Sequence, residues 1–397
     1  MKEMFLRELA DIQTGPFGSQ LHKEDYVENG TPIVTVEHLG NKDFSEQNLP
    51  RVSNSDKERL KKYVLKEGDI VFSRVGSVDR CSYVDKTHEG WMFSGRCLRV
   101  RPNTEIDSEY LYYYFCMDEI KEFVRNIAVG ATMPSINTKL LGEVTVRFPD
   151  LVQQKKIVGV LSAIDGKIKV NQKINDNLQQ QAQALFKSWF LNYEPWDGTA
   201  PNSWLHGKLG DYANIKRGGS PRPIQEYLSN SGLRWLKISD VTGLQTPFII
   251  DIKDHIIEEG LKKTVFLKAG SLVLSNSATP GIPKILDVDS CIHDGWLYFP
   301  ESRFSNEYLY LYFKYIRQQL VNLSNGSVFN NLKTDILKGY PTILPDEGTL
   351  QRFDEIIKPM FLQMQNLTRE SHDLMDLRDT ILPRLMSGEL DVSNIQL

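Results

Sequence analysis

The sequence of 397 residues predicts a mixed α/β fold in which two similar globular domains are separated by an antiparallel coiled coil of two long helices. Two observations predict this fold class. The first is internal repetition, since residues 109–115 (EYLYYYF) return as 307–313 (EYLYLYF) and 88–91 (HEGW) return as 293–296 (HDGW). The second is a heptad pattern of apolar residues after each copy. A period of about 200 residues belongs to a whole domain and not to a solenoid repeat, so two copies imply an approximate twofold axis.

Further short segments agree between the halves and occur in the same order. They pair residues 9–12 with 209–212, 66–71 with 268–273, and 130–137 with 326–331. His88 and His293 then occupy matching places, where a turn leading into a strand is the expected structure. We interpret the chain as one duplicated unit.

Four parts are expected along the chain. Residues 1–149 form the first domain, 150–193 the central long helix, 194–345 a linker and the second domain, and 346–397 the C-terminal long helix. A helix near 108–126 is expected to use its aromatic residues for core packing. Strand patterns, recognised by alternating apolar residues between glycine-bearing loops, occur in both domains at residues 31–36, 69–72, 233–238 and 271–274.

The composition is that of a soluble globular protein, with 41% apolar and 25% charged residues. No apolar run approaches the ~18 residues of a membrane span, and residues 1–6 lack the apolar core of a signal peptide, so we expect a cytoplasmic protein. The four cysteines show no C-x-x-C spacing and are expected to be reduced, buried thiols. A net charge of −4 is not that of a dedicated nucleic-acid binder, so DNA contacts would use local patches or be shared with a partner.

Both long helices carry a heptad seam. An antiparallel pair of about 36 to 40 residues is roughly 55 to 60 Å long, so it would act as a ruler between the two domains. Asn171 and Asn175 interrupt the first seam, where they either fix the register of the partner helix or lie on a solvated stretch. Pro359 and Pro383 predict kinks or frayed ends in the second helix. The predicted seam residues are Ile157, Leu161, Ile164, Ile168, Asn171, Leu178 and Leu185 on the first helix and Phe353, Ile357, Met360, Met364, Leu367, Leu374, Ile381 and Leu385 on the second.

Catalytic and metal-binding motifs are largely missing. The chain contains no G-x-x-x-x-G-K-[ST], H-E-x-x-H or G-x-S-x-G motif. Residues 15–18 resemble a cofactor-binding turn only faintly, and the acid-x-Lys triplets 119–121 and 251–253 have no Pro-Asp pair to complete a metal cage. His88 and His293 have no neighbouring ligand set. We therefore predict no catalytic residue and no metal ligand.

Polar and basic residues gather on loops where the two copies differ. Arg and Lys can bind guanine or phosphate, Asn and Gln adenine, and Ser or Thr either. Different loops on like frames would recognise two unlike half-sites, although each residue could also occupy an ordinary solvated loop. The candidate DNA-binding residues are Gln13, Thr14, Ser19, Arg74, Ser77, Arg80, Thr132, Ser135, Lys216, Arg217, Ser220, Arg222, Asn276, Ser277, Thr279, Asn330 and Asn331.

Three motifs carry a resemblance to a known family. They are residues 130–139 (GATMPSINTK), residues 153–165 with QQKKI and VLSAID, and residues 377–390 (LRDTILPRLMSGEL). Together they resemble the specificity subunit of type I restriction-modification systems over essentially the whole chain. The chain departs from this pattern at residues 348–351, where the second copy lacks the fuller QQKKI start.

The resemblance implies a division of labour. Each domain would be a target-recognition domain that reads one half of an asymmetric bipartite sequence in double-stranded DNA, and the helices would dock two modification (adenine methyltransferase) subunits. Restriction (translocase and nuclease) subunits would complete the complex. S-adenosylmethionine, ATP and magnesium would be bound by those partners, and this chain would bind no cofactor. The alternatives are a two-headed protein-binding scaffold without DNA specificity, and an enzyme with an unrecognised site.

Overall fold

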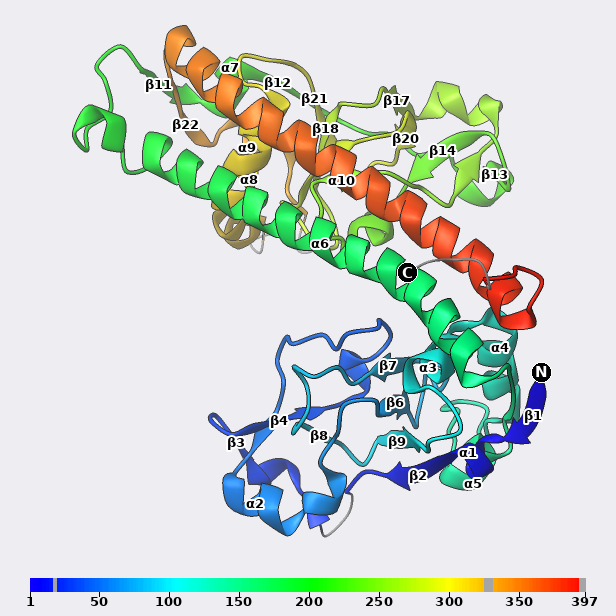
Figure 1. Cartoon of the computed structure of the whole chain (residues 1–397). Coiled ribbons are helices and arrows are strands. Elements are labelled where there is room, and N and C mark those ends of the chain that lie inside the picture. Colours follow the sequence, from blue (N-terminus) through cyan, green and yellow to red (C-terminus); the bar gives the residue numbers. More distant parts are fainter. Residues whose placement is uncertain (17–19, 325–330, 393–397) are drawn as a thin grey trace. The chain divides into compact units, whose positions relative to one another are not determined.

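A computed structural model describes residues 1–16, 20–324 and 331–392. The chain divides into two compact units, Met1–Gly166 with Leu374–Leu397, and Lys167–Asp373. Each unit contains one globular domain and a part of both long helices (Figure 1). The mixed α/β fold class with two domains and two long helices is therefore confirmed.

The first domain is built on two four-stranded sheets and one two-stranded ribbon. The sheets have the orders β2-β9-β6-β7 and β3-β5-β4-β8, and β1 pairs with β10. In the second sheet β4 and β8 are parallel. The elements are β1 (Lys2–Phe5), α1 (Leu6–Leu9), β2 (Ala10–Thr14), β3 (Tyr26–Val27), β4 (Thr31–Val34), β5 (Arg51–Val52), α2 (Asn54–Arg59), β6 (Ile70–Ser73), β7 (Cys81–Tyr83), β8 (Met92–Phe93), β9 (Cys97–Pro102), α3 (Ser108–Cys116), α4 (Asp118–Ile127), α5 (Thr138–Gly142), β10 (Thr145–Phe148) and α6 (Leu151–Phe190).

The second domain repeats this order with two additional strands, β15 and β17. Its sheets have the orders β12-β21-β18-β19-β15 and β13-β16-β14-β20-β17, and β11 pairs with β22. The elements are β11 (Leu205–Lys208), α7 (Leu209–Tyr212), β12 (Ala213–Arg217), β13 (Leu228–Ser229), β14 (Leu233–Leu236), β15 (Phe248–Ile249), β16 (His255–Ile256), β17 (Val265–Leu267), β18 (Leu272–Ser275), β19 (Pro283–Leu286), β20 (Ser290–Ile292), β21 (Trp296–Ser302), α8 (Asn306–Ser324), α9 (Thr334–Lys338), β22 (Pro341–Leu344) and α10 (Glu347–Ser387).

The structure tests the alignment of the repeat pairs predicted from sequence, and the pair 9–12 and 209–212 is wrong. Leu6, and not Leu9, corresponds to Leu209, because the amides of Leu6 and Leu209 both bind a carbonyl just before the last strand of their domain, at 2.8 Å and 2.9 Å. The similarity of 9–12 to 209–212 is thus shifted by one helical turn. The pair 66–71 and 268–273 is confirmed, since the amides of Gly68 and Gly270 bind equivalent carbonyls. Gly68 binds Val84 directly after β7 at 2.9 Å, and Gly270 binds Leu286 at the end of β19 at 2.7 Å.

The HEGW and HDGW turns lie on opposite sides of equivalent strands. His88 precedes β8, whereas His293 follows β20, and these two strands pair in the same parallel way with β4 and β14. The counterpart of the His293 turn is the turn of Ser94, closed by Cys97 N to Ser94 O at 2.9 Å, as Trp296 N binds His293 O at 3.1 Å. Both histidine turns do lead into a strand, but they are not equivalent positions.

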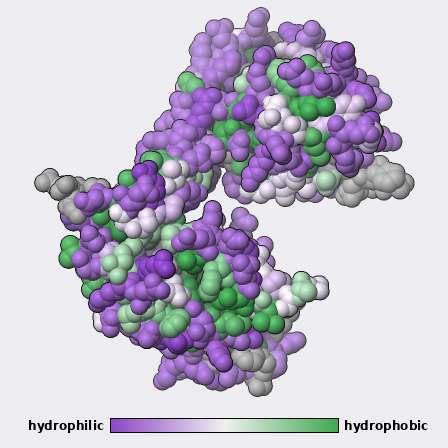
Figure 2. All heavy atoms as spheres, turned by 90° about the vertical axis from the view of Figure 1, so that its right-hand side faces the viewer, coloured by the Kyte–Doolittle hydropathy of each residue, from purple (hydrophilic) through white to green (hydrophobic). Residues whose placement is uncertain are grey.

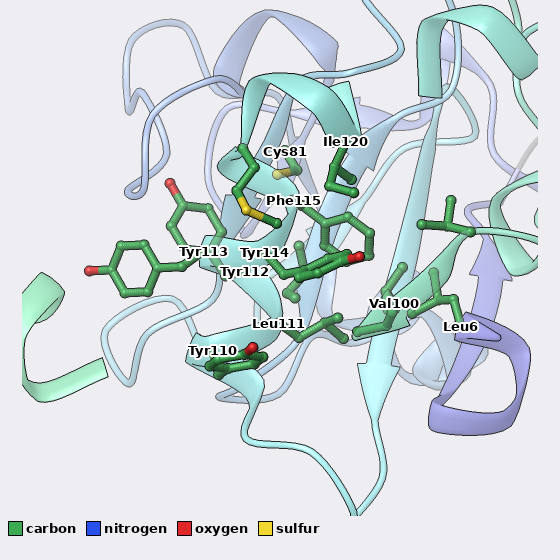
Figure 3. Close-up of a cluster of buried hydrophobic side chains, with 14 of the residues drawn as sticks. Leu6, Cys81, Val100, Tyr110, Leu111, Tyr112, Tyr113, Tyr114, Phe115 and Ile120 are labelled. Carbon is green, nitrogen blue, oxygen red and sulfur yellow. The ribbon is translucent and has the colours of Figure 1, made fainter. Parts of the chain in front are cut away.

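The aromatic helices form the core of each domain, as predicted. Tyr110, Leu111 and Phe115 of α3 are at most 1% exposed, and Leu111 lies beside Leu6 and Val100 in Figure 3. The predicted single helix at 108–126 is wrong in one respect, because Met117 adopts an extended conformation (ψ 137°) and separates α3 from α4. In the second domain the corresponding α8 is continuous.

The rest of the surface agrees with an ordinary globular composition. On the face shown in Figure 2 both units are mostly hydrophilic, and hydrophobic side chains gather in limited areas. All four cysteines are free thiols, and three are buried, as predicted. No helix in the described part of the chain is long and apolar enough to cross a membrane.

The two long helices run antiparallel. In the first unit Ile157 and Leu161 of α6 share a buried cluster with Leu382 and Leu385 near the end of α10. In the second unit the late part of α6 shares a cluster with the early part of α10. The predicted fraying at Pro383 is wrong. Both prolines are exposed, and the helix continues unbroken to Ser387.

Candidate nucleic-acid interface

Loops from three strand ends converge in each domain, at one end of the sheet that contains β2 and β6 in the first domain and β12 and β18 in the second. In the first domain Gly15 N binds Cys97 O at 3.2 Å and Arg74 N binds Arg96 O at 2.8 Å. In the second domain the equivalent bonds join Gly218 to Trp296 (2.9 Å) and Asn276 to Gly295 (2.8 Å). The loops after β2, β6 and β8, and after β12, β18 and β20, therefore have a common backbone frame.

A fourth segment is attached to the same loops. Ile136 N donates to Arg74 O at 2.9 Å, and Leu332 N donates to Asn276 O at 2.8 Å. The segment that carries the GATMPSINTK motif thus closes the loop cluster of the first domain. Its Asn137 side chain then accepts from Leu140 N at 2.9 Å and caps α5, so the motif has a clear structural role.

Asp294 joins several candidate residues of the second domain. Its backbone carbonyl accepts from Arg217 Nε at 2.5 Å and from Asn276 Nδ2 at 3.3 Å. Its carboxylate accepts from Ser220 Oγ at 2.7 Å and from Arg222 Nη2 at 3.2 Å. Three residues from the end of β12 and the loop after it, together with Asn276 after β18, are therefore held around one acidic residue that the sequence analysis had not selected.

The electrostatics of this cluster keep Asp294 ionised. Burial alone would raise its pKa, but the hydroxyl of Ser220 and the charges of Arg217 and Arg222 lower the pKa of Asp294 below its ordinary value. The guanidinium groups remain accessible, since the Arg217 and Arg222 side chains are 52% and 80% exposed. Asp294 thus orients two exposed cations, an arrangement suited to phosphate or guanine.

An open cavity of about 820 Å³ lies beside this cluster. It combines apolar and cationic side chains and is lined by Ser220, Pro221, Arg222, Pro223, Ile224, Trp235, Lys237 and His293. Lys237 is paired with Asp254, and hydrogen bonding to that carboxylate raises the pKa of Lys237. The rim of the cavity is therefore positively charged at neutral pH.

The first domain presents different side chains on the same frame. Arg74 is half-buried and donates from Nη1 to Gly95 O at 3.2 Å. Arg80 is exposed, although its guanidinium also reaches Leu39 O. Arg96 is exposed at the centre of this cluster and was missed from sequence, because only the backbone contact of Arg74 to Arg96 reveals its place.

The remaining candidates differ in accessibility. Ser77, Thr132 and Lys216 are exposed, while Gln13, Thr14, Ser135, Ser277, Thr279 and Asn331 are half-buried. Asn276 is only 4% exposed, so its amide supports the loop in this conformation. Ser19 and Asn330 lie outside the described residues.

The helical seam is buried at about half of its predicted positions. Ile157, Leu161, Ile168, Asn171, Phe353, Ile357, Met364 and Leu385 are buried, whereas Ile164, Leu178, Leu185, Met360, Leu367, Leu374 and Ile381 are half-buried. Sequence reasoning missed the buried Phe186, Phe361 and Thr368. A strict heptad drifts around a straight helix by about 20° per repeat, so buried positions move to the neighbouring residue along the seam.

A polar layer interrupts the apolar contacts of the helix pair in the second unit. Asn171 Nδ2 donates to Glu370 Oε2 at 2.8 Å and to Ser371 Oγ at 3.3 Å, and Asn175 Nδ2 donates to Thr368 Oγ1 at 3.2 Å. Both asparagines are at most 9% exposed, which excludes the solvated alternative. The Oδ1 atoms of both asparagines are buried without a hydrogen-bond partner.

The described residues offer little for catalysis. They contain no group of three or more His, Cys, Asp or Glu side chains that could hold a metal ion. His88 is buried and packs against the Phe44 and Trp91 rings, and its Nδ1 lies 2.6 Å from Oδ1 of the half-buried Asp85, so this histidine is part of the domain interior. The arrangement favours binding by loops.

Comparison with known proteins agrees with this reading. A family model described as the type I restriction modification DNA specificity domain matches residues 1–180 and 201–369. The type I restriction enzyme MjaIX specificity subunit of Methanocaldococcus jannaschii is 25% identical over 418 residues, which cover 98% of this chain and 93% of the relative. The HindI specificity subunit of Haemophilus influenzae is 23% identical over 405 residues, covering 83% and 88%.

A solved structure has a similar fold. The S subunit of a type I restriction-modification system from M. genitalium matches with a TM-score of 0.62 and 17% identity, covering 97% of this chain and 95% of that chain. At this identity the likeness concerns the fold alone.

Proposed function

The chain belongs to the type I restriction-modification DNA specificity family, and from this premise we propose that it is the non-catalytic subunit that selects the DNA sequence for such a complex. Each domain reads one half of an asymmetric bipartite target. The observation that carries the proposal is the pair of loop clusters on a common backbone frame, one centred on Asp294 with Arg217 and Arg222, the other presenting Arg74, Arg80 and Arg96. Two loop clusters with the same backbone hydrogen bonds but different side chains are suited to two different half-site sequences.

The long helices are the proposed docking surface for two modification subunits. These partners supply S-adenosylmethionine and the methyl transfer, and restriction subunits supply ATP- and magnesium-dependent translocation and cleavage in the cytoplasm. A methyltransferase must take adenine out of the base stack, so the role of this chain is to fix the register of the complex on DNA. The partners also contribute phosphate contacts, in agreement with the net charge of −4 of this chain.

A domain exchange tests the proposal. Residues 1–149 are replaced by the corresponding domain of a relative with a different target, and the methylated sequence is read by methylome sequencing of cells that also express the methyltransferase. We expect one half of the target to change while the other half and the spacer stay constant. An active chimera with an unchanged target rejects the proposal.

The scaffold alternative predicts a different result in a binding assay. If both domains bind proteins only, the complex with methyltransferase gives no sequence-selective, salt-sensitive shift of duplex DNA. A sequence-selective, salt-dependent shift excludes that alternative. Methylation or cleavage by this chain alone would instead identify an unrecognised active site.

A further inference from the structure

The carboxylate of Asp165 joins three separate elements of the first unit. Tyr113 of α3 donates from its hydroxyl to Oδ2 at 2.6 Å, and Arg378 of α10 donates from Nη1 to Oδ1 at 2.9 Å. Lys42, in the loop after the short helix Val36–His38, places Nζ 3.7 Å from Oδ2. Asp165 itself belongs to α6, so one side chain attaches the first domain to both long helices.

The surrounding groups hold this junction in a defined geometry. Lys42 Nζ also binds Glu109 and the Tyr113 hydroxyl (2.9 Å), and it lies 4.9 Å from the centre of the Tyr113 ring. Two cations and two carboxylates thus alternate, and the Asp165 side chain is only 12% exposed. Burial alone would lower the pKa of Arg378, but the hydrogen bond that Arg378 donates to Asp165 raises this pKa above its ordinary value, so the pair stays charged.

The second unit fills the equivalent place with aromatic rings. Asp150 and Asp346 cap α6 and α10 in the same way, accepting from the amide three residues later at 3.0 Å and 2.9 Å. Counted from these caps, the counterpart of Asp165 is Phe361. Its ring is 2% exposed and packs edge-on against Tyr310 at 5.5 Å and Phe248 at 6.3 Å.

The contacts of Asp165 in the first unit and of Phe361 in the second unit therefore differ in how strictly they fix the angle between a domain and its long helices. Aromatic packing tolerates small shifts, whereas charge-assisted hydrogen bonds need their donors at fixed positions. Removing one partner of a buried ionic group is destabilising. Without Asp165, Lys42 would keep Glu109 and Arg378 would keep Asp379, but no anion would lie between the two cations. The orientation of the first domain on its helices depends on this carboxylate.

We propose that Asp165 is a positioning residue, which fixes the angle of the first domain on the paired helices and thereby the distance at which the first half of the DNA target is read. This inference rests on the proposed function. It assigns no base contact to Asp165 and concerns the spacer between the half-sites, not their sequence.

The test uses Asp165→Asn in the full chain, assembled with its methyltransferase partners. Methylation is measured on duplexes that carry both half-sites with the native spacer or with one base pair more or fewer. We expect the preference for the native spacer to fall about tenfold, the change that corresponds to 1.4 kcal/mol, while the base preferences within both half-sites stay unchanged. A general loss of stability would lower methylation of all duplexes alike.

Asp379→Asn is the matched control. Asp379 also pairs with Arg378, at 2.8 Å, but its side chain is 65% exposed, and this contact joins two neighbouring residues of α10. It should leave the spacer preference within about twofold of wild type, as expected for an exposed pair. Arg378→Gln is a second variant of the junction and should act like Asp165→Asn if the latter folds poorly.

The outcomes separate the two proposals. A wild-type complex without sequence-selective methylation overturns the proposed function. A selective wild-type complex whose spacer preference survives both Asp165→Asn and Arg378→Gln overturns the positioning role. Hydrogen exchange of the free chain is a measurement that needs no DNA. The amides of α3 and of the Lys42 loop should exchange faster in Asp165→Asn than in Asp379→Asn. Equal exchange in both variants would contradict the proposal that Asp165 holds the first domain on its helices.

Discussion

Gly15 and Gly218 occupy equivalent positions at the loop clusters, and neither leaves room for a side chain. A Cβ atom would lie 2.1 Å from Ser94 O at Gly15 and 2.3 Å from His293 O at Gly218. Because the collision is with backbone, the neighbouring loop would have to move. The close approach of these chains is what brings the candidate DNA-binding loops together in both domains.

Gly218→Ala should therefore disturb the second loop cluster. We expect a loss of roughly 1 to 3 kcal/mol in the free energy of unfolding, the usual result of overpacking, measured from urea denaturation. In the assembled complex, recognition of one half-site should weaken and the other should persist. Gly166→Ala is the control, because a Cβ there meets nothing within 4 Å and Ala in a helix should stabilise by up to about 1 kcal/mol. Equal effects of both changes would contradict the steric argument.

Arg222→Ala tests the Asp294 cluster directly. If the exposed guanidinium contacts a base, the change should weaken DNA binding by about 1 to 3 kcal/mol and relax specificity at one position, as measured by mobility shift with single-base variants of the target. The same expectation holds for Arg217→Ala and Arg74→Ala. A phosphate contact would instead weaken all sequences alike and reduce the salt slope.

Lys268→Ala is the matched control for Arg222→Ala. Lys268 is 75% exposed and pairs with Asp289 at 2.7 Å, and it precedes β18, whereas Asn276 follows that strand. Like Arg222→Ala, Lys268→Ala removes one positive charge, but at the end of β18 opposite to the loop cluster. Affinity lost equally in both variants would show a general charge effect and would reject a specific contact of Arg222.

Lys284 of β19 predicts a pH dependence of stability. It is 3% exposed, and its Nζ binds the carbonyls of Leu244 (2.6 Å) and Thr246. Burial lowers the pKa of Lys284 from 10.5 to about 7. Between these values the unfolded chain binds more protons than the folded chain, so the contribution of this residue rises with pH and is least favourable below about pH 7.

The comparison with Lys284→Met isolates this effect. The stability of wild type relative to the variant should rise with pH across the window from about 7 to 10.5, by at most about 1.4 kcal/mol per pH unit, in urea denaturation at several pH values. Lys268→Met, at an exposed site, should show no such slope. If the difference in free energy of unfolding between wild type and Lys284→Met did not depend on pH, the two carbonyls would hold Lys284 charged across this whole pH range.

The long helices could be predicted well because their pattern is local and repeated. Residues 150–193 were expected for a helix that spans Leu151–Phe190, and the aromatic repeat placed α3 and α8 correctly. The break at Met117 could not be predicted, since the sequence there continues an amphipathic pattern. The similarity of HEGW and HDGW predicted a wrong alignment of the two domains, because a turn of the same composition can precede or follow a strand.

The candidate site was less accessible to sequence reasoning. Arg217 and Asp294 are 77 positions apart, and no local pattern indicates that their loops meet. Asp165 is the last residue of the VLSAID motif, but its partners come from α3, α10 and a distant loop. Loop residues could be selected by composition and by divergence between copies, whereas their neighbours and burial depend on tertiary contacts.

The polar layer predicts that register and stability can be separated. Asn171→Leu removes a buried Oδ1 without a partner, while Ser371 keeps its bond to Leu367 O at 2.8 Å and Glu370 keeps Lys167 at 3.2 Å. We expect a change between zero and about +1 kcal/mol in the free energy of unfolding. Because a buried polar residue restricts the register, cysteine cross-linking between α6 and α10 should yield additional products.

Ile168→Ala is the control for this prediction. Ile168 lies one turn before Asn171 and is 7% exposed, so its truncation should cost about 2 to 5 kcal/mol without new cross-links. If Asn171→Leu destabilises the chain by a similar amount, or if its cross-links match wild type, the layer does not act as a register device.

Paired deletions in the two helices test the proposed ruler. Residues 169–175 of α6 and 368–374 of α10 contain the facing polar layer, and removing seven residues from each shortens both helices by about 10.5 Å. This equals roughly three base pairs at 3.4 Å each. Because a whole heptad is removed from both partners, the remaining seam keeps its phase. The methylated target should therefore keep both half-sites with a shorter spacer, or methylation should be lost. Deletion from one helix alone shifts the partners past each other and should abolish folding of the pair, seen as a loss of helical signal on heating. A doubly shortened chain that methylates the original spacer at full activity would show that the helices do not set the distance between half-sites.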